Sequence, residues 1–210
     1  MFCFSEWDLS VPCLRMQEAG VGMLSLLDEV KDIKIHYLDE ISSQIVIEED
    51  QNSLEANARK KAVELSKHTD WYVFASDVGV DIPGLGDKWD ILKNQRIVGE
   101  TKTDKEKVDT LISLMSGLKG DDRRCSHHLA LALAKGGNLL WSLEDTTDFG
   151  CIVEKPQNTD IPSYGWMGHV WYYPQFKKTF NQINEVKKNE TRKILEKIKE
   201  ELQQYLKMIG

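Results

Sequence analysis

Apolar residues recur along the chain at two spacings, and each spacing predicts one kind of element. Between residues 53 and 67 the apolar positions fall three or four apart, at Leu54, Ala58, Ala62 and Leu65. This spacing places them along one side of an α-helix, so the pattern predicts an amphipathic helix that packs its apolar side against the rest of the protein. A similar stripe predicts a final helix over residues 189–208.

Two segments carry the start signal of a helix, a small polar residue followed three positions later by Glu. Asn52 with Glu55 predicts the start of the first helix, and Thr103 with Glu106 predicts another, which ends near Gly117. Residues 15–30 are also predicted to be helical, despite two glycines, which are poor helix formers.

Strand patterns lie between these helices. From Cys125 to Ala134 large and small side chains alternate, which is the period of a β-strand. The Gly136–Gly137 turn and the returning segment complete a central hairpin. Shorter strands are expected over 33–37, 45–47, 71–75 and 149–154, and residues 156–175 are expected to form a loop. Because helices and strands are interspersed, we expect an α/β fold with a mixed sheet.

Composition narrows the class of protein. The 210 residues are 41% hydrophobic, which is enough for a packed core, and we expect one domain over residues 1–210. An excess of 34 acidic over 27 basic residues argues against a general nucleic-acid binder. Neither a membrane-spanning run nor a secretory leader is expected from the sequence. Four scattered cysteines predict thiols in a reducing cytoplasm rather than a zinc or disulfide framework.

The charge is unevenly distributed. From Lys177 to the end there are nine basic and five acidic residues, whereas the rest of the chain is strongly acidic. The basic end could bind an anionic ligand and the acidic part a cation. The simpler alternative is a helix whose Lys and Glu side chains face solvent.

Carboxylates are the first candidates for chemistry. Glu48, Glu49 and Asp50 lie just before a predicted helix, and Asp77 follows a predicted strand. Acidic residues at such strand ends could share Mg²⁺, which prefers oxygen ligands and substrate phosphates. The alternative is that these loops are simply solvated.

A second group of candidates could bind a flat base and its phosphates. Residues 164–174 (YGWMGHVWYYP) gather aromatic rings around two glycines, which suits stacking, although such rings can equally pack on the core. Residues 76–86 are glycine-rich and allow a close approach of the backbone. His127 and His128 point to opposite faces of a strand, so we expect core roles for them, and His169 is the better candidate for ligand contact.

Taken in order, several segments resemble the noncanonical purine NTP pyrophosphatases, the inosine/xanthosine triphosphatase family. The similar segments are IEEDQNSLEANARKKA (47–62), FASDVGVDIPGLG (74–86), NQRIVGE (94–100), RRCSHHLALAL (123–133), TTDFGCI (146–152), SYGWM (163–167), KKTF (177–180) and KKNETRK (187–193). The resemblance covers most of the chain and depends on the order of the segments rather than on any single match.

The resemblance implies a fold and an activity. The family has an elongated mixed β-sheet with flanking helices, in two lobes around a central cleft, and works as a cytoplasmic homodimer with Mg²⁺. It hydrolyses nucleoside triphosphates such as ITP, dITP and XTP to the monophosphate and pyrophosphate, which cleans the nucleotide pool. We therefore expect a Mg²⁺-dependent pyrophosphatase whose partner is its nucleotide substrate.

The family motifs also imply site residues. Glu49 and Asp77 match the carboxylates that bind the metal or activate water. The implied substrate-binding residues are Ser10, Arg15, Gly79, Arg96, Tyr164, Gly165, Trp166, Lys188 and Arg192.

The sequence departs from the family pattern at two informative positions. Pro12 lies in the segment that matches the phosphate loop, and it lacks a backbone N–H. Met167 lies where the family has an Asp that binds the base. Two alternatives therefore stay open, a nucleotide-binding homologue without hydrolytic activity and a related pyrophosphatase with another base preference.

Overall fold

The structure, a computed structural model, describes residues 2–4, 8–11, 26, 34–37, 45–156, 165–191 and 193–209. Its strands are β1 (Phe2–Phe4), β2 (Asp8–Val11), β3 (Lys34–Tyr37), β4 (Tyr72–Asp81), β5 (Arg124–Lys135), β6 (Asn138–Ile152), β7 (Trp171–Tyr173) and β8 (Lys178–Thr179). Its α-helices are α3 (Leu54–Ser66), α4 (Asn94–Val98), α5 (Asp104–Leu114), α6 (Glu185–Thr191) and α7 (Lys193–Ile209). Short 3₁₀ helices are η1 (Pro83–Lys88), η2 (Ile91–Lys93), η3 (Gly120–Arg123), η4 (Trp166–His169) and η5 (Phe180–Gln182).

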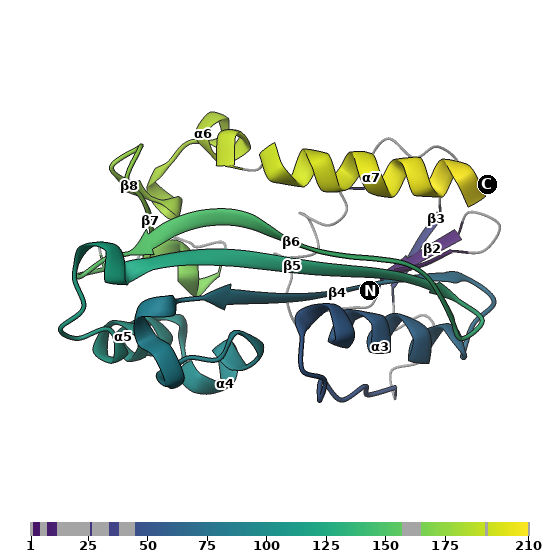
Figure 1. Ribbon diagram of the computed structural model, residues 1–210, viewed down its shortest axis with the longest axis horizontal. Helices are drawn as coiled ribbons and strands as arrows, with labels where there is room; N and C mark the ends of the chain where they lie inside the picture. Colours follow the sequence, from purple (N-terminus) through teal and green to yellow (C-terminus); the bar gives the residue numbers. More distant parts are fainter. Residues whose placement is uncertain are drawn as a thin grey trace. The chain divides into compact units, whose positions relative to one another are not determined.

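The strands form a mixed sheet, which confirms the predicted α/β class. In the described residues eight strands follow the order β1-β3-β2-β4-β5-β6-β7-β8, with β1 also paired to β4. Strand β2 is parallel to β3 and β4, whereas the pairs β6–β7 and β7–β8 are antiparallel. Figure 1 shows β4, β5 and β6 as the long central strands.

The chain divides into two compact units that share these strands. Unit 1 comprises Met1–Val78, Leu129–Asp145 and Leu195–Gly210, and unit 2 comprises Gly79–His128 and Thr146–Ile194. Each of β4, β5 and β6 therefore begins in one unit and ends in the other.

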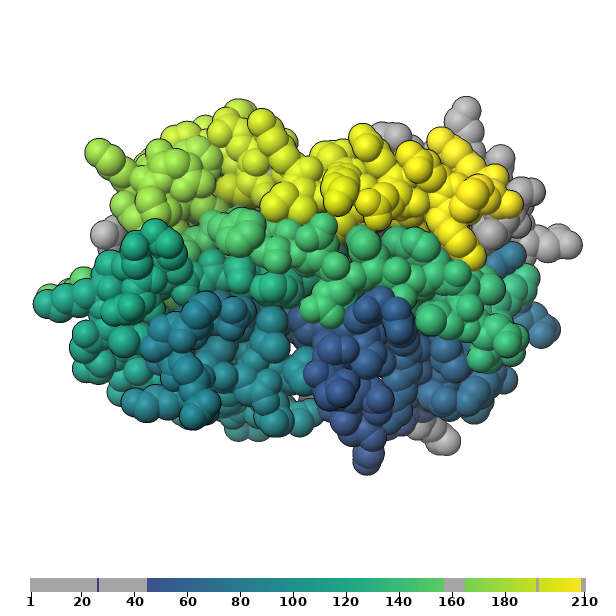
Figure 2. Space-filling view, in the orientation of Figure 1, coloured from purple at the N-terminus to yellow at the C-terminus, as the bar shows by residue number. Residues whose placement is uncertain are grey.

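In unit 1 two helices cover opposite faces of the sheet. Val73 packs with Leu65 of α3, whereas the next residue, Phe74, packs with Ile198 and Leu202 of α7. Successive side chains of a strand point to opposite faces, so α3 and α7 lie on different sides, as Figure 1 shows. Figure 2 shows the yellow atoms of α7 directly against the green atoms of β6.

The alternating pattern of β5 has the same explanation. Leu129, Leu131 and Leu133 pack in the α7 cluster, and the alanines between them are completely buried on the other face. Both faces are covered here, and the smaller residues lie on the α3 side, where Ala58 and Ala62 are also completely buried. Small residues on facing surfaces allow a helix and a sheet to approach closely.

Unit 2 has a core of its own, where a buried arginine donates hydrogen bonds to several backbone carbonyls. Its buried residues include Leu111 and Met115 beside aromatic residues from η4 and β7. The Arg123 guanidinium donates to the carbonyls of Ile152 (2.7 Å), Met115 (3.0 Å) and Leu118 (3.1 Å). The buried cation thereby satisfies carbonyls that the ends of α5 and β6 leave without partners.

Several predicted boundaries are wrong, and one predicted strand is absent. Residues 45–47 do not form a strand. The first helix is capped by Ser53, whose hydroxyl accepts from the Ala56 N–H, and not by Asn52. The segment predicted to return from the Gly136–Gly137 turn and the first part of the predicted strand 149–154 belong to one strand, β6, which ends at Ile152. The predicted helix at 15–30 lies outside the described residues, apart from residue 26.

The C-terminal prediction also needs correction. The structure has α6 before α7, with Arg192 between them outside the described residues. The basic residues Lys187 and Lys188 therefore belong to α6 rather than to the start of the final helix. The capping box at Thr103 and Glu106 is confirmed. None of the helices in the described part of the chain combines the length and apolar character that a bilayer crossing requires.

Candidate active site

Glu49 and Asp77, far apart in the sequence, contact the same lysine. The Lys61 ammonium lies 2.9 Å from Glu49 Oε1 and 3.0 Å from Asp77 Oδ1. The side chains of Lys61 and Asp77 are each only 13% exposed, whereas that of Glu49 is 43% exposed. The two carboxylates predicted to act together therefore both contact the Lys61 ammonium, at a place that solvent partly reaches.

Two elements of unit 1 position these groups. Asp77 lies inside β4, which runs past residue 75 to Asp81, so the prediction that it follows the strand is wrong. Lys61 projects from α3, and Glu49 lies in the segment that leads into that helix. Since α3 packs on the face of the sheet that β4 helps to form, a helix residue reaches a carboxylate in mid-strand.

Asn57, one helical turn before Lys61, completes the cluster. Its Nδ2 donates to Asp77 Oδ2 at 3.0 Å, and its Oδ1 accepts from the backbone N–H of Gln51, also at 3.0 Å. The residue is 2% exposed. Each oxygen of the Asp77 carboxylate thus accepts a hydrogen bond from a different residue of α3.

Burial dominates the electrostatics of Asp77. Desolvation raises the pKa of this carboxyl above its ordinary value, and the negative charge of Glu49 raises it further. Lys61 and the hydrogen bond from Asn57 act in the opposite direction but do not reverse the shift. Additional positive charge nearby would stabilise the ionised form of this carboxyl. Because its pKa is raised, it also accepts a proton more readily than an exposed aspartate.

The donor set fits a hard divalent cation. Mg²⁺ commonly binds through one or two carboxylates and completes its shell with water and substrate phosphates. Glu49 and Asp77 supply two such carboxylates, both directed at one positive charge. Within the described residues no group of three or more His, Cys, Asp or Glu side chains is placed to hold a metal. Any ion at Glu49 and Asp77 would therefore depend on other ligands, such as phosphate oxygens.

Two other predicted site residues lie in unit 2 and make ordinary structural contacts. A Cβ on Gly79 would lie 2.5 Å from both the Cγ1 and the carbonyl oxygen of Ile91, so the glycine allows η2 to pack against β4. Arg96 on α4 is exposed and lies 3.5 Å from Glu100. Their predicted roles in substrate binding stay predictions.

The aromatic loop is described from Gly165 onward. Gly165 has a φ of +86°, which favours glycine, and Trp166 is buried in the core of unit 2. Trp166 therefore packs on the core, which is one of the two alternatives predicted for the aromatic rings of this loop. Lys188 is also buried, with its ammonium 2.7 Å from Glu185 and 5.2 Å from the centre of the Phe180 ring.

The remaining predicted residues cannot be placed by their side chains. Arg15, Tyr164 and Arg192 lie outside the described residues. Ser10 is described as part of β2, where it pairs with Val73, and nothing is described of its side chain.

His127, His128 and Cys125 make the structural contacts that the sequence favours, whereas His169, the candidate for ligand contact, is buried. His127 and His128 contact different partners, Thr147 for the first and Ser126 for the second. His169 is buried and bonds to Asn181. Burial raises the pKa of the Cys125 thiol well above its ordinary value, which makes it a poor nucleophile.

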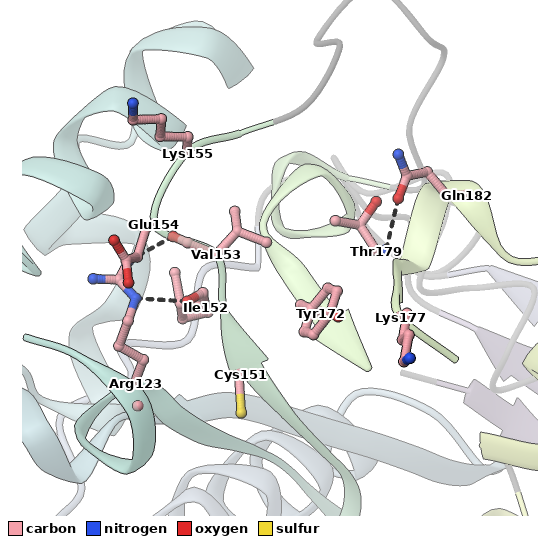
Figure 3. Close-up of a pocket in the computed structure, with 11 residues that line it drawn as sticks. Arg123, Cys151, Ile152, Val153, Glu154, Lys155, Tyr172, Lys177, Thr179 and Gln182 are labelled. Atoms are coloured by element: carbon pink, nitrogen blue, oxygen red, sulfur yellow. Dashed lines mark hydrogen bonds between the residues drawn. The ribbon is translucent and has the colours of Figure 1, made fainter. Parts of the chain in front are cut away.

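A hollow in unit 2 lies apart from the predicted residues. It has a volume of about 460 Å³, and Figure 3 shows the guanidinium of Arg123 at its wall, bonded to backbone carbonyls. It is lined by Gly120, Arg123, Cys151, Ile152, Val153, Glu154, Lys155, Tyr172, Lys177, Thr179 and Gln182. None of the predicted site residues that the structure describes lines it, so we assign it no role in the proposed reaction.

Sequence reasoning missed Lys61 and Asn57. Both stand beside the apolar stripe of α3, four residues apart, immediately before Ala62 and Ala58. A polar pair at this spacing lies on one side of a helix, next to the buried stripe. That position was the signal that they face the sheet rather than the solvent.

The carboxylate–lysine cluster on a mixed α/β fold is consistent with a phosphate-processing protein, and comparison with known proteins defines its family. A model of the Ham1 family matches residues 16–198, and the chain belongs to this family. A protein of Desulforamulus reducens called dITP/XTP pyrophosphatase is 28% identical over 145 residues, which cover 68% of this chain and 69% of that protein. A protein of Clostridium perfringens with the same name is 26% identical over 187 residues, covering 84% and 88%.

A solved structure shows the same fold. The Ham1 protein of Coxiella burnetii superposes with a TM-score of 0.76 at 24% identity, and the match covers 94% of this chain and 98% of that one. The family model thus confirms the predicted resemblance, and the shared fold confirms the fold class.

Proposed function

We propose that this protein hydrolyses a nucleoside triphosphate to the monophosphate and pyrophosphate with the help of a divalent cation such as Mg²⁺. The observation that carries the proposal is the convergence of Glu49 and Asp77 on Lys61 in a chain of the Ham1 family. Because relatives carry the name dITP/XTP pyrophosphatase, we expect ITP, dITP or XTP as the substrate of this protein.

The residues of the cluster have complementary tasks in this reaction. Glu49 and Asp77 would hold the cation, which when bound neutralises phosphate charge and helps to orient water. Asp77 either serves as such a ligand or accepts the proton of the water that attacks the α-phosphorus. Its raised pKa makes it a better proton acceptor than an exposed aspartate. Lys61 offsets the negative charge of both acids and of an approaching phosphate.

Residues near the start of the sequence, in the aromatic loop and at the basic end complete the proposal. Arg15, Lys188 and Arg192 offset charge on the phosphates, and Tyr164 with Gly165 packs on the base. A cytoplasmic homodimer, as the resemblance implies, stays a prediction that the molar mass in solution would check.

A substrate panel tests the proposal. Purified protein with Mg²⁺ is expected to release pyrophosphate from ITP, dITP or XTP faster than from ATP, GTP or dUTP. Asp77→Asn should lower kcat by about 100-fold or more, because it removes the proton acceptor or metal ligand. Asp109→Asn, an equivalent change at an exposed residue of α5, should leave turnover unchanged. Full activity in Asp77→Asn would contradict the assigned role.

One observation favours a second candidate, a pyrophosphatase with a different base preference. Met167 is partly buried against the core of unit 2, where the family has an aspartate. A thioether is only a weak acceptor for the N–H of a purine. The same panel decides, because preferential turnover of a pyrimidine or ordinary nucleotide would support this candidate. Thermal stabilisation by nucleotides without any product would indicate a binding protein that does not hydrolyse them.

A further inference from the structure

Asn57 connects the two segments that carry the proposed catalytic acids. Its carbonyl oxygen accepts from the Gln51 N–H, two residues after Glu49, and its amide nitrogen donates to Asp77. Both distances are 3.0 Å, and the residue is almost completely buried. One side chain therefore ties the loop before α3 to the middle of β4.

The chemistry of the partners fixes the orientation of this amide. The Gln51 N–H can only donate, so it requires the oxygen of Asn57, and the NH₂ group must then face the Asp77 carboxylate. An aspartate at position 57 would place a second carboxylate against the first. A shorter side chain could not span both partners.

The contact also determines how Asp77 presents its oxygens. Lys61 holds Oδ1 and Asn57 holds Oδ2, so the plane of the carboxylate is set by two donors on one helix. The terminal torsion of aspartate is otherwise broad. Without Asn57, the carboxylate keeps the bond to a long and flexible lysine, and the Glu49 segment loses its bond to a buried side chain and keeps the ion pairs with Lys60 and Lys61.

We propose that Asn57 is the positioning residue of this site, which sets the orientation of the Asp77 carboxylate and its separation from the Glu49 loop. The inference rests on the proposed function, because it assigns Asn57 a task in presenting these acids to the cation and the nucleotide. Outer partners that orient metal-binding groups typically matter by about 10- to 100-fold in affinity or activity.

Two variants and a matched control test the proposal. Asn57→Leu has a similar volume and removes both hydrogen bonds, and Asn57→Ser is a smaller change that cannot bridge the two partners. Ser66→Ala alters another completely buried polar residue of α3, whose hydroxyl bonds to Val63 and Gly137 far along the helix from Asp77. Thermal unfolding first establishes that each protein is folded.

The first readout is the separation of kcat from KM. Both Asn57 variants should lose about 10-fold or more in kcat, with KM for the nucleotide little changed, because Asn57 contacts an acid rather than the substrate. Ser66→Ala should retain kcat even where it costs stability. An unchanged kcat in both Asn57 variants, or an equal loss in Ser66→Ala, would overturn the proposal while the proposed function stands.

The second readout needs no turnover. Binding of Mn²⁺ alone, followed by electron paramagnetic resonance, should be weaker by about 10-fold in the Asn57 variants and unchanged in Ser66→Ala. Equal Mn²⁺ affinity in all proteins would overturn the positioning role. If the unaltered protein neither binds Mn²⁺ nor hydrolyses any nucleotide, the proposed function fails, and this inference fails with it.

Discussion

At the scale of single residues, Lys61 is the group on which both acids depend. It is surrounded by similar residues in the sequence, Arg59 and Lys60, but only Lys61 is buried against β4. Arg59 bonds to Glu55 on the helix surface, and Lys60 pairs with the exposed Asp50. Three consecutive basic residues therefore have three different environments, because each step along a helix rotates the side chain by about 100°.

We expect Lys61→Met and Lys60→Met to differ sharply in stability. Loss of Lys61 leaves Asp77 buried beside Glu49 without its cation, which should cost about 1–3 kcal/mol of unfolding free energy in urea at neutral pH. Lys60→Met removes a pair exposed to solvent and should change little. Equal effects of the two substitutions would show that the Lys61 contacts do not matter for folding.

The sequence revealed the acids of the site more readily than their partners. Glu49 stands in a run of acidic residues, and Asp77 interrupts an apolar strand, so both are conspicuous. Lys61 and Asn57 are common residue types in a polar helix, and their importance depends on which side of α3 faces the sheet. The apolar stripe beside them indicates that side, but which carboxylates they meet there depends on tertiary packing.

At the scale of elements, the β5–β6 pair buries two titratable groups with opposite tendencies. Burial lowers the pKa of His127 on β5 to about 4, and burial raises the pKa of Asp148 on β6 to about 6. His127 bonds to Thr147, and Asp148 accepts from the Tyr173 hydroxyl. Both groups are therefore held mainly in their neutral forms in mildly acidic solution.

The pH dependence of stability should separate these groups. Because its folded pKa is raised, Asp148 gives stability that is complete below about pH 4 and is lost as the pH rises through 6. Relative to the unaltered chain, Asp148→Asn should therefore gain about 2–3 kcal/mol between pH 4 and pH 7, measured by urea unfolding.

His127 should behave in the opposite way. Its folded pKa is lowered from an ordinary value of 6.5, so its contribution is complete above that pH and is lost as the pH falls through 4. His127→Gln should accordingly gain relative stability as the pH falls. Parallel pH profiles for both variants and the unaltered chain would contradict the buried, neutral state of these residues.

Element types were predicted better than element ends. The helix of 53–67 and the Cys125–Ala134 strand are present, because their periodic patterns extend over many residues. The predicted strand 71–75 ends too early compared with β4, because Asp77 and Gly79 are of residue types that are common in loops. In the fold, hydrogen bonds from Lys61 and Asn57 stabilise the aspartate inside the strand. The glycine is needed there because it allows the close contact with Ile91.

At the scale of the whole molecule, the two units are interleaved in the chain. The backbone passes between them after Val78, His128, Asp145 and Ile194. Three of these crossings lie at or inside the long strands β4, β5 and β6. Strand hydrogen bonding that continues through both units should make their unfolding cooperative.

Hydrogen exchange in Leu202→Ala would test this cooperativity. Leu202 is completely buried in the unit 1 core, and its truncation should cost about 2–5 kcal/mol. If the units unfold together, amides of α5 in unit 2 should also exchange faster by mass spectrometry. Faster exchange confined to unit 1 would show that the units open separately.

The same interleaving has a consequence for synthesis on the ribosome. The strip of apolar residues on α7 that closes the unit 1 core, Ile198, Leu202 and Leu206, follows β4, β5 and β6 in the chain. Until α7 has been synthesised, Phe74 and the leucines of β5 therefore lack the side chains that cover them in the folded protein. A ribosome that stalls before codon 195 would release a chain with an exposed apolar sheet face, a form that chaperones and proteases recognise.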